Sequence, residues 1–226
     1  MHLLEEIKKY FIYLSELGID FFPFNENLNK FLKNNNYLSI NNIERIKNSL
    51  LTCKKCTLHR IRKQPIWGGG NEEAQLMIIS EYPDRDEDFY GRPFAGSSEE
   101  ILKKMLSAIK LRMEDFFITH AVKCKTPGGR PPESDEILAC KSYLLNQIKL
   151  LNPKLILAFG FTPPKMFFEN NPAFSSIRGN FIKIKDSIVL FTYHPNYIIK
   201  NPIVKRLIWE DLQKFRKFYE EIFQNF

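Results

Sequence analysis

Four cysteines are the residues of this 226-residue chain whose types and spacing most directly suggest chemistry. Cys53 and Cys56 form a C-x-x-C pair, and Cys124 and Cys140 follow after 67 and then 15 intervening residues. Four thiolates make a complete soft ligand set for a metal ion or an iron–sulfur cluster, which is the interpretation we favour. The pair alone could also be a redox pair or half of a zinc site, and the four could simply be small buried hydrophobes. Disulfides are disfavoured because no signal peptide is recognised.

The composition is that of a globular protein with a substantial core. Hydrophobic residues make up 44% of the chain and aromatic residues 14%, which is enough for one α/β domain with an added segment. No apolar stretch approaches the ~20 residues that span a bilayer, so we expect a cytoplasmic protein with no membrane partner. The net charge of +7 is compatible with a polyanionic partner such as DNA.

From Gln75 onward, short apolar runs alternate with helical periods, and this alternation predicts a parallel sheet covered by helices on both faces. Four main strands are predicted, with an extra strand at Phe181 to Ile184. The main strands are Leu76 to Ile79, Phe116 to Ile118, Leu155 to Phe159 and Ile188 to Phe191. Helices are predicted at Ser97 to Ile109, at Glu133 to Leu150, after Pro164, and from Ile203 to about Phe223.

The first 49 residues differ in pattern from the rest. They contain an amphipathic helical period from Leu3 to Leu17, a break at Gly18 and an Asn-rich run. We therefore predict a helical extension over residues 1–49 and a main domain over residues 50–226.

Polar residues follow the predicted strands, where the carboxyl ends of parallel strands form a ligand crevice. Glu81, His120, Gly160 and His194 all lie at such positions. We expect them to share one pocket lined by acids and two histidines.

These residues belong to strings that occur in the order found in one known family. The strings are Cys53-x-x-Cys56, Ser80-Glu81-Tyr82-Pro83-Asp84, Gly91-Arg92-Pro93-Phe94-Ala95-Gly96, Ile118-Thr119-His120-Ala121-Val122-Lys123-Cys124, Arg130-x-Pro132, Cys140 and His194-Pro195. From about Cys53 to Asp211 the chain resembles the family 4 iron–sulfur uracil-DNA glycosylases.

The resemblance implies an α/β/α three-layer fold around a central, mainly parallel four-stranded sheet. It also implies a [4Fe-4S] cluster on the four cysteines. Zinc is the alternative, because sequence alone cannot distinguish zinc from iron–sulfur ligation. The implied activity is hydrolysis of the N-glycosidic bond of uracil, or of a related damaged base, in DNA at the start of base excision repair. We expect a monomer with DNA as its partner.

The resemblance also assigns roles to residues of the predicted pocket. Phe94 would stack on the flipped base, and His194 would donate a hydrogen bond to the developing uracil anion. Glu81 matches the acidic position of the family's first motif, and Glu87 lies where the family keeps another acid. The loop after His194 would contact DNA, with Tyr197 and Ile198 as wedges into the duplex; the residues concerned are Asn196, Tyr197, Ile198 and Lys200.

Two departures from the family pattern affect the predicted activity. The first motif usually reads Gly-Glu-Ala-Pro-Gly, whereas this chain has Ser80, Tyr82 and Asp84 at the first, third and fifth positions. The family's base-reading Asn is replaced by His120, whose two ring nitrogens point in opposite directions. Tyr82 and His120 are therefore expected at the substrate, and an iron–sulfur DNA-binding homologue with weakened or lost activity is the alternative.

Overall fold

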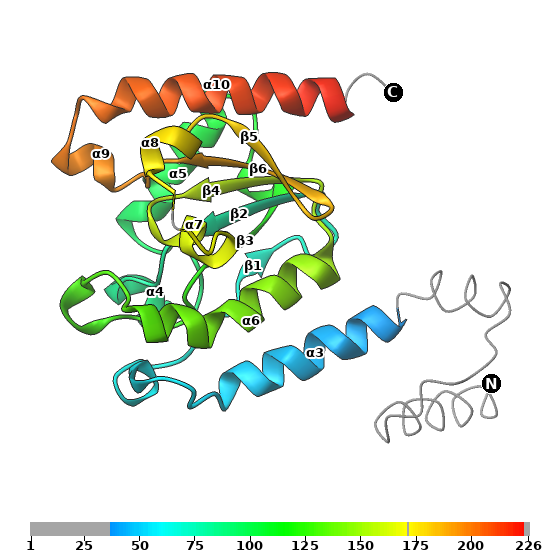
Figure 1. Cartoon of the computed structure of the whole chain (residues 1–226), viewed down its shortest axis with the longest axis vertical. Helices are drawn as coiled ribbons and strands as arrows, with labels where there is room; N and C mark the ends of the chain where they lie inside the picture. Colours follow the sequence, from blue (N-terminus) through cyan, green and yellow to red (C-terminus); the bar gives the residue numbers. More distant parts are fainter. Residues whose placement is uncertain (1–36, 171, 224–226) are drawn as a thin grey trace, which may run out of the picture. The chain divides into compact units, whose positions relative to one another are not determined.

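A computed structural model describes residues 37–170 and 172–223 of the chain (Figure 1). The chain divides into two compact units, Met1–Asn42 and Ile43–Phe226, and the second unit contains every motif discussed above. Helix α3 (Tyr37–Leu51) passes through the predicted boundary between residues 49 and 50. The predicted helix from Leu3 to Leu17 lies outside the described residues.

The sheet of the second unit has the strand order β1-β3-β2-β4-β6-β5. The four predicted main strands form its parallel centre, and the predicted extra strand pairs antiparallel at one edge. The prediction of a four-stranded sheet missed a two-residue strand at the other edge, so the sheet has six strands. The strands are β1 (Gly69–Gly70), β2 (Leu76–Ser80), β3 (Phe116–His120), β4 (Leu155–Phe159), β5 (Phe181–Ile184) and β6 (Ser187–Thr192).

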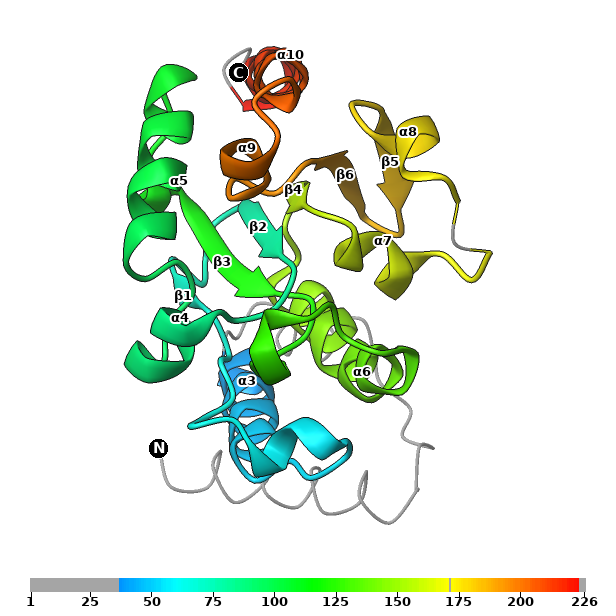
Figure 2. The ribbon, with the colours of Figure 1, turned by 90° about the vertical axis from the view of Figure 1, so that its left-hand side faces the viewer.

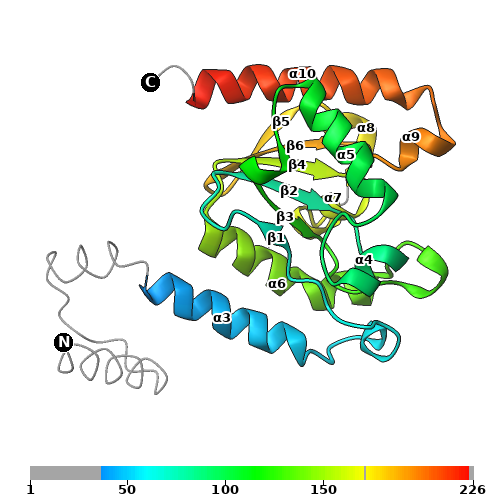
Figure 3. The same ribbon diagram turned by 180° about the vertical axis from the view of Figure 1, so that it is seen from behind.

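Helices cover both faces of the sheet, which confirms the predicted three-layer arrangement (Figures 1 and 3). The central strands are apolar throughout because successive side chains point to opposite faces and both faces are buried. Leu76 and Ile78 of β2 pack in one core cluster with α5 (Ser97–Ala108) and α10 (Val204–Phe223). Met77 and Ile79 pack in the other cluster, with α6 (Ser134–Leu151).

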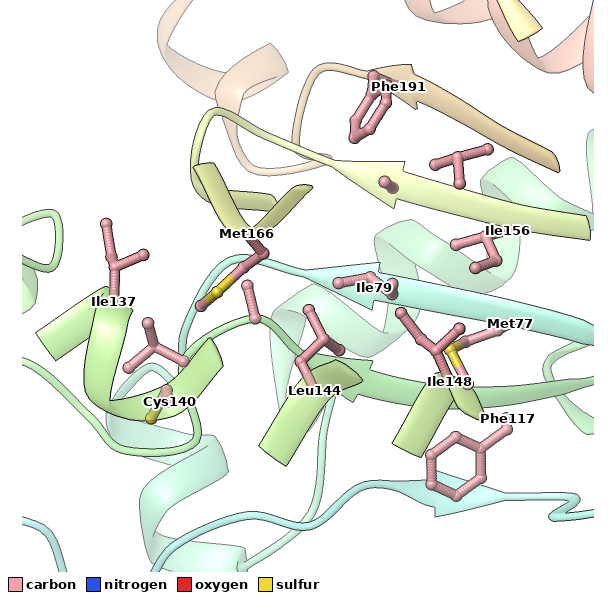
Figure 4. Close-up of a cluster of buried hydrophobic side chains, with 14 of the residues drawn as sticks. Met77, Ile79, Phe117, Ile137, Cys140, Leu144, Ile148, Ile156, Met166 and Phe191 are labelled. Carbon is pink, nitrogen blue, oxygen red and sulfur yellow. The ribbon is translucent and has the colours of Figure 1, made fainter. Parts of the chain in front are cut away.

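The cluster on the α6 side also contains two of the four cysteines, Cys124 and Cys140. Figure 4 shows Cys140 within this cluster. Cys140 lies among Ile137 and Leu144 on the inner side of α6. These two metal-ligand candidates thus belong to the packed interior of this layer, whereas Cys53 and Cys56 are partly exposed.

The strand order reverses between the neighbouring strands β2 and β4. It runs from β2 to the neighbouring strand β3, returns to β4 on the other side of β2, and continues outward to β6. A crevice at the carboxyl ends of the strands is expected at such a switch point. Short helices surround this edge (Figure 2): α4 (Arg85–Tyr90), α7 (Thr162–Phe167), α8 (Phe174–Ile177) and α9 (Tyr197–Lys200).

In the part of the chain that the structure describes, no helix is both long and apolar enough to cross a membrane.

Candidate active site

The backbone of Phe94 is held in an unusual conformation. Its φ angle of 49° lies in the left-handed region, which bulky residues rarely adopt. The Phe94 N–H donates to Glu87 Oε1 at 2.6 Å, and its carbonyl accepts a hydrogen bond from Arg92 Nη1 at 2.9 Å. Such strain costs about 1–3 kcal/mol and persists only where the surroundings impose it. These two contacts therefore fix the Phe94 ring in place.

Glu87 connects this loop to the end of β3. Its Oε2 accepts the N–H of Asp84 at 2.7 Å, and its Oε1 lies 3.3 Å from His120 Nε2. Burial alone would raise the pKa of Glu87, but the His120 imidazole and the backbone N–H groups of Asp84 and Phe94 outweigh it and lower the pKa. Glu87 is therefore an ionised, buried residue that positions Phe94.

His120 is fully buried at the end of β3, and among the described residues neither of its ring nitrogens has a hydrogen-bond partner. The 3.3 Å contact with Glu87 lacks hydrogen-bond geometry. Unpaired buried polar groups cost about 1–3 kcal/mol each. A polar ligand that bonded to the ring would remove that cost.

His194 is hydrogen-bonded at both ring nitrogens. Nδ1 accepts the N–H of Asn196 at 3.2 Å, so the proton of the neutral ring is on Nε2, which lies 2.9 Å from Ser80 Oγ. Burial lowers the pKa of His194, although Glu81 and Glu87 oppose that shift. His194 is therefore a neutral imidazole with Nε2–H as its donor.

Phe94 brings the two histidines into one site. Its ring centroid lies 6.4 Å from that of His120 and 6.1 Å from that of His194, and its plane is within 8° of the His194 plane. Phe94 and His120 are fully buried, whereas His194 is partly exposed. The two histidines, from the carboxyl ends of β3 and β6, therefore both lie beside Phe94.

Glu81 bridges the two strands at the switch point. Its Oε1 accepts hydrogen bonds from Phe161 N, Thr162 N and Thr162 Oγ1 at 2.9, 3.1 and 3.0 Å. Its carboxyl group lies against Gly160, where an added Cβ would come within 2.2 Å of Glu81 Cδ. Gly160 also has a φ of 89°, so only glycine fits beside this carboxylate.

The two other departures in the first motif have structural explanations. Asp84 is the N-cap of α4, where its side chain accepts the N–H of Glu87 in a capping box. The Tyr82 hydroxyl donates to the carbonyl of Gly129 at 3.2 Å, and its ring packs against the α6-side cluster, whereas Phe94 belongs to the other cluster. Tyr82 is thus directed toward the loop after Cys124.

The predicted DNA-contacting loop begins with the turn that holds His194. Asn196 supplies the N–H to His194, while Tyr197 and Ile198 are partly buried against the core. Lys200 ends α9, and its side chain lies outside the described residues.

Three cations of the loop after β3 have protein partners. Lys123 is fully buried and donates to Thr119 Oγ1, the His120 carbonyl and Gln147 Oε1, so it cannot reach a phosphate. Lys125 and Arg130 form ion pairs, with Asp88 at 3.4 Å and with Glu136 at 2.8 Å respectively. Lys123 is thus a buried cation and not a solvated surface charge.

The four cysteines are free thiols: Cys124 and Cys140 are buried, and Cys53 and Cys56 are partly exposed. Among the described residues, no group of three or more His, Cys, Asp or Glu side chains lies close enough to hold a metal ion. Burial raises the pKa of the Cys124 thiol and raises that of Cys140 to about 12. The four thiols have the soft donor chemistry of a metal or cluster site, and a bound cation would be needed to hold the buried ones as thiolates.

Arg62 was missed by sequence reasoning and links two of these cysteines. Its Nη1 donates to Cys124 Sγ at 2.9 Å, and its Nη2 donates to the carbonyl of Cys53 at 2.7 Å. Only its position six residues after Cys56 hints at this contact.

Comparisons with known proteins agree with this geometry. Residues 67–213 match the model of the uracil DNA glycosylase superfamily. A type-4 uracil-DNA glycosylase from Sulfurisphaera tokodaii is 37% identical over 187 residues, covering 79% of this chain and 85% of that protein. Similar enzymes from Saccharolobus solfataricus and Thermotoga maritima are 36% and 34% identical, covering 79% and 75% of this chain and 87% and 90% of their own. The chain belongs to the type-4 uracil-DNA glycosylase family.

Proposed function

We propose that this type-4 uracil-DNA glycosylase binds the flipped uracil against Phe94, with His120 at the edge of the base and His194 as the donor to the leaving group. The observation that supports the proposal is the buried His120 ring, whose two nitrogens have no hydrogen-bond partner in the part of the chain that the structure describes. It lies beside an aromatic ring held rigidly in place. A uracil edge offers both donors and acceptors, and a glycosylase reads the extruded base by such contacts.

The reaction separates charge, and the site has a group for each sign. Cleavage of the C1′–N1 bond leaves its electron pair on the uracil, so negative charge develops on the base and positive charge on the sugar. His194 Nε2–H transfers its hydrogen bond from Ser80 Oγ to the uracil oxygen as that charge develops. One preorganised donor of this kind contributes about 2.7–4 kcal/mol to transition-state stabilisation.

Glu81 provides the negative charge for the sugar. Its Oε1 is occupied by Phe161 and Thr162, and among the described residues no hydrogen bond to Oε2 is found. Oε2 is then available to orient the attacking water, whose oxygen bonds to C1′ and whose proton leaves to solvent or to the departing base. The fixed carboxylate also stabilises the positive sugar electrostatically.

The finer assignment of the cofactor is also a proposal. A [4Fe-4S] cluster would be bound by Cys53, Cys56, Cys124 and Cys140. Membership of the type-4 family favours this cluster over zinc. Arg62 supports the assignment because it already links Cys53 and Cys124. The cluster would hold the loop after β3 and α6 together, and no step of the hydrolysis involves it.

The natural partner would be DNA, bound by a monomeric, cytoplasmic protein. The net charge of +7 supports a polyanionic ligand. Residues 1–49 would be an accessory segment to the glycosylase domain of residues 50–226.

Substitution of His120 tests the proposed base contact. We expect His120→Leu to lower uracil excision about 5- to 150-fold, because it removes polar contacts worth roughly 1–3 kcal/mol, with DNA affinity nearly unchanged. His120→Asn should restore much of the rate, since an amide presents a donor and an acceptor on one side. Tyr82→Phe is the control, as it removes only the bond to Gly129. Equal rates and base preference in all four proteins would show that His120 does not touch the base.

A further inference from the structure

Four aromatic rings form a contiguous group on the surface next to the active site. They come from four segments: Phe161 follows β4, Phe174 begins α8, Tyr193 follows β6 and Tyr197 begins α9. The centroids of Phe161 and Phe174 are 4.6 Å apart, and those of Phe174 and Tyr193 are 5.2 Å apart. Tyr193 and Tyr197 are stacked, 5.4 Å apart with 9° between their planes. We call these four residues the aromatic platform.

The platform is partly open to solvent, unlike the rings of the hydrophobic core. Phe161 is 41% exposed, and the other three rings are only partly buried. The Arg178 guanidinium lies 6.0 Å from the Tyr193 ring and is itself paired with Asp211 at 2.7 Å. That cation therefore supports the platform and is not free for a phosphate.

Two connections tie the platform to the catalytic residues. The N–H of Phe161 donates to Glu81 Oε1 at 2.9 Å, and Tyr193 immediately precedes His194 in the chain. Tyr197 follows in the same turn, and its N–H bonds to the His194 carbonyl at 2.9 Å. The platform is thus fixed relative to the pocket through the same backbone that positions His194 and Glu81.

From this geometry we infer that the platform stacks a base of the nucleotide adjacent to the target uracil on the same strand. Neighbouring bases in a strand are separated by only about 3.4 Å of rise, so a base next to the one held at His194 can reach these rings. Exposed aromatic rings bind bases of unpaired strands through stacking, which tolerates any sequence. The platform would act in substrate binding, and the inference depends on the proposed binding of uracil by Phe94 and His194.

The inference is tested by combining a protein substitution with a nucleotide substitution, as in a double-mutant cycle, on single-stranded oligonucleotides that contain uracil. We expect Phe161→Leu to raise KM about 5- to 150-fold, the range for one lost base stack, with kcat within about twofold of the wild type. Replacing one neighbouring nucleotide by an abasic analogue, on the 5′ or the 3′ side, should weaken wild-type binding by a similar factor. On that substrate Phe161→Leu should have no further effect.

Trp209→Leu is the matched control, because Trp209 of α10 is also 41% exposed and should leave KM unchanged. Tyr197→Leu provides a second variant should Phe161→Leu fail to fold. An unchanged KM in both platform variants would overturn the inference. So would a KM increase in Phe161→Leu that is the same on the intact oligonucleotide and on both abasic substrates. Wild-type excision is measured in the same experiment: its absence would refute the proposed function, whereas normal excision without coupling would refute the platform alone.

Discussion

Replacement of His194 by alanine should reduce the rate of base release far more than it reduces DNA binding. The substitution removes the only ring N–H that the hydrogen-bond pattern leaves for the uracil, since Nδ1 is occupied by the N–H of Asn196. A single anion-stabilising donor is worth about 2.7–4 kcal/mol, which corresponds to a loss of roughly 10²–10³ in kcat. KM should change little, because the charge develops only in the transition state.

The measurement is a single-turnover assay of alkali-labile sites in a uracil-containing oligonucleotide, together with a binding titration. Ser80→Ala is the control, since it removes the resting partner of His194 Nε2 and leaves the donor in place. We expect less than about a tenfold change in kcat for that variant, because a net hydrogen bond contributes only about 0.5–1.5 kcal/mol. A His194→Ala enzyme that retains the wild-type rate, or that loses affinity and rate in equal proportion, would refute this role of His194.

Three further predictions follow from the site. Because burial lowers the pKa of His194, the ring should remain a neutral donor and excision should persist below pH 6.5, which a pH–rate profile checks. The lowered pKa also means that the unfolded chain binds more protons than the folded chain just below pH 6.5. Folding stability should therefore fall there with acidification. Gly160→Ala should lower the free energy of unfolding by about 1–3 kcal/mol and reduce kcat, because the added Cβ displaces the Glu81 carboxylate; denaturant titration and the excision assay measure both effects, and an unchanged variant would contradict the packing argument. Protein purified without air should contain about four irons per chain, and Cys124→Ala should lose iron and stability, whereas stoichiometric zinc in the native protein would exclude the cluster.

The parallel strands could be predicted because their apolar runs are continuous, as burial on both faces requires. Strand β4 has the predicted bounds, and the convergence of His120 and His194 follows from their places at carboxyl ends. Helix α4 was not predicted, although Asp84 and Glu87 have the spacing of a capping box that could have revealed it. The two-residue strand β1 is too short for any periodic signal.

Other parts of the site depend on contacts between distant segments. Nothing near Lys123 in the sequence indicates that Gln147, on helix α6, would accept its hydrogen bond in the interior. The pairing of Ser80 with His194 joins residues 114 positions apart. The three hydrogen bonds that fix Glu81 at the start of α7 likewise arise only when β2 and β4 lie side by side.

The most direct test of the account is the excision of uracil itself. Wild-type protein incubated with an oligonucleotide containing one uracil should release the base and produce an alkali-labile abasic site, without direct strand cleavage. The matching oligonucleotides with thymine or cytosine at that position should remain intact. No abasic product on single- or double-stranded uracil substrates, or equal release of all three bases, would contradict a uracil-reading site formed by Phe94, His120 and His194.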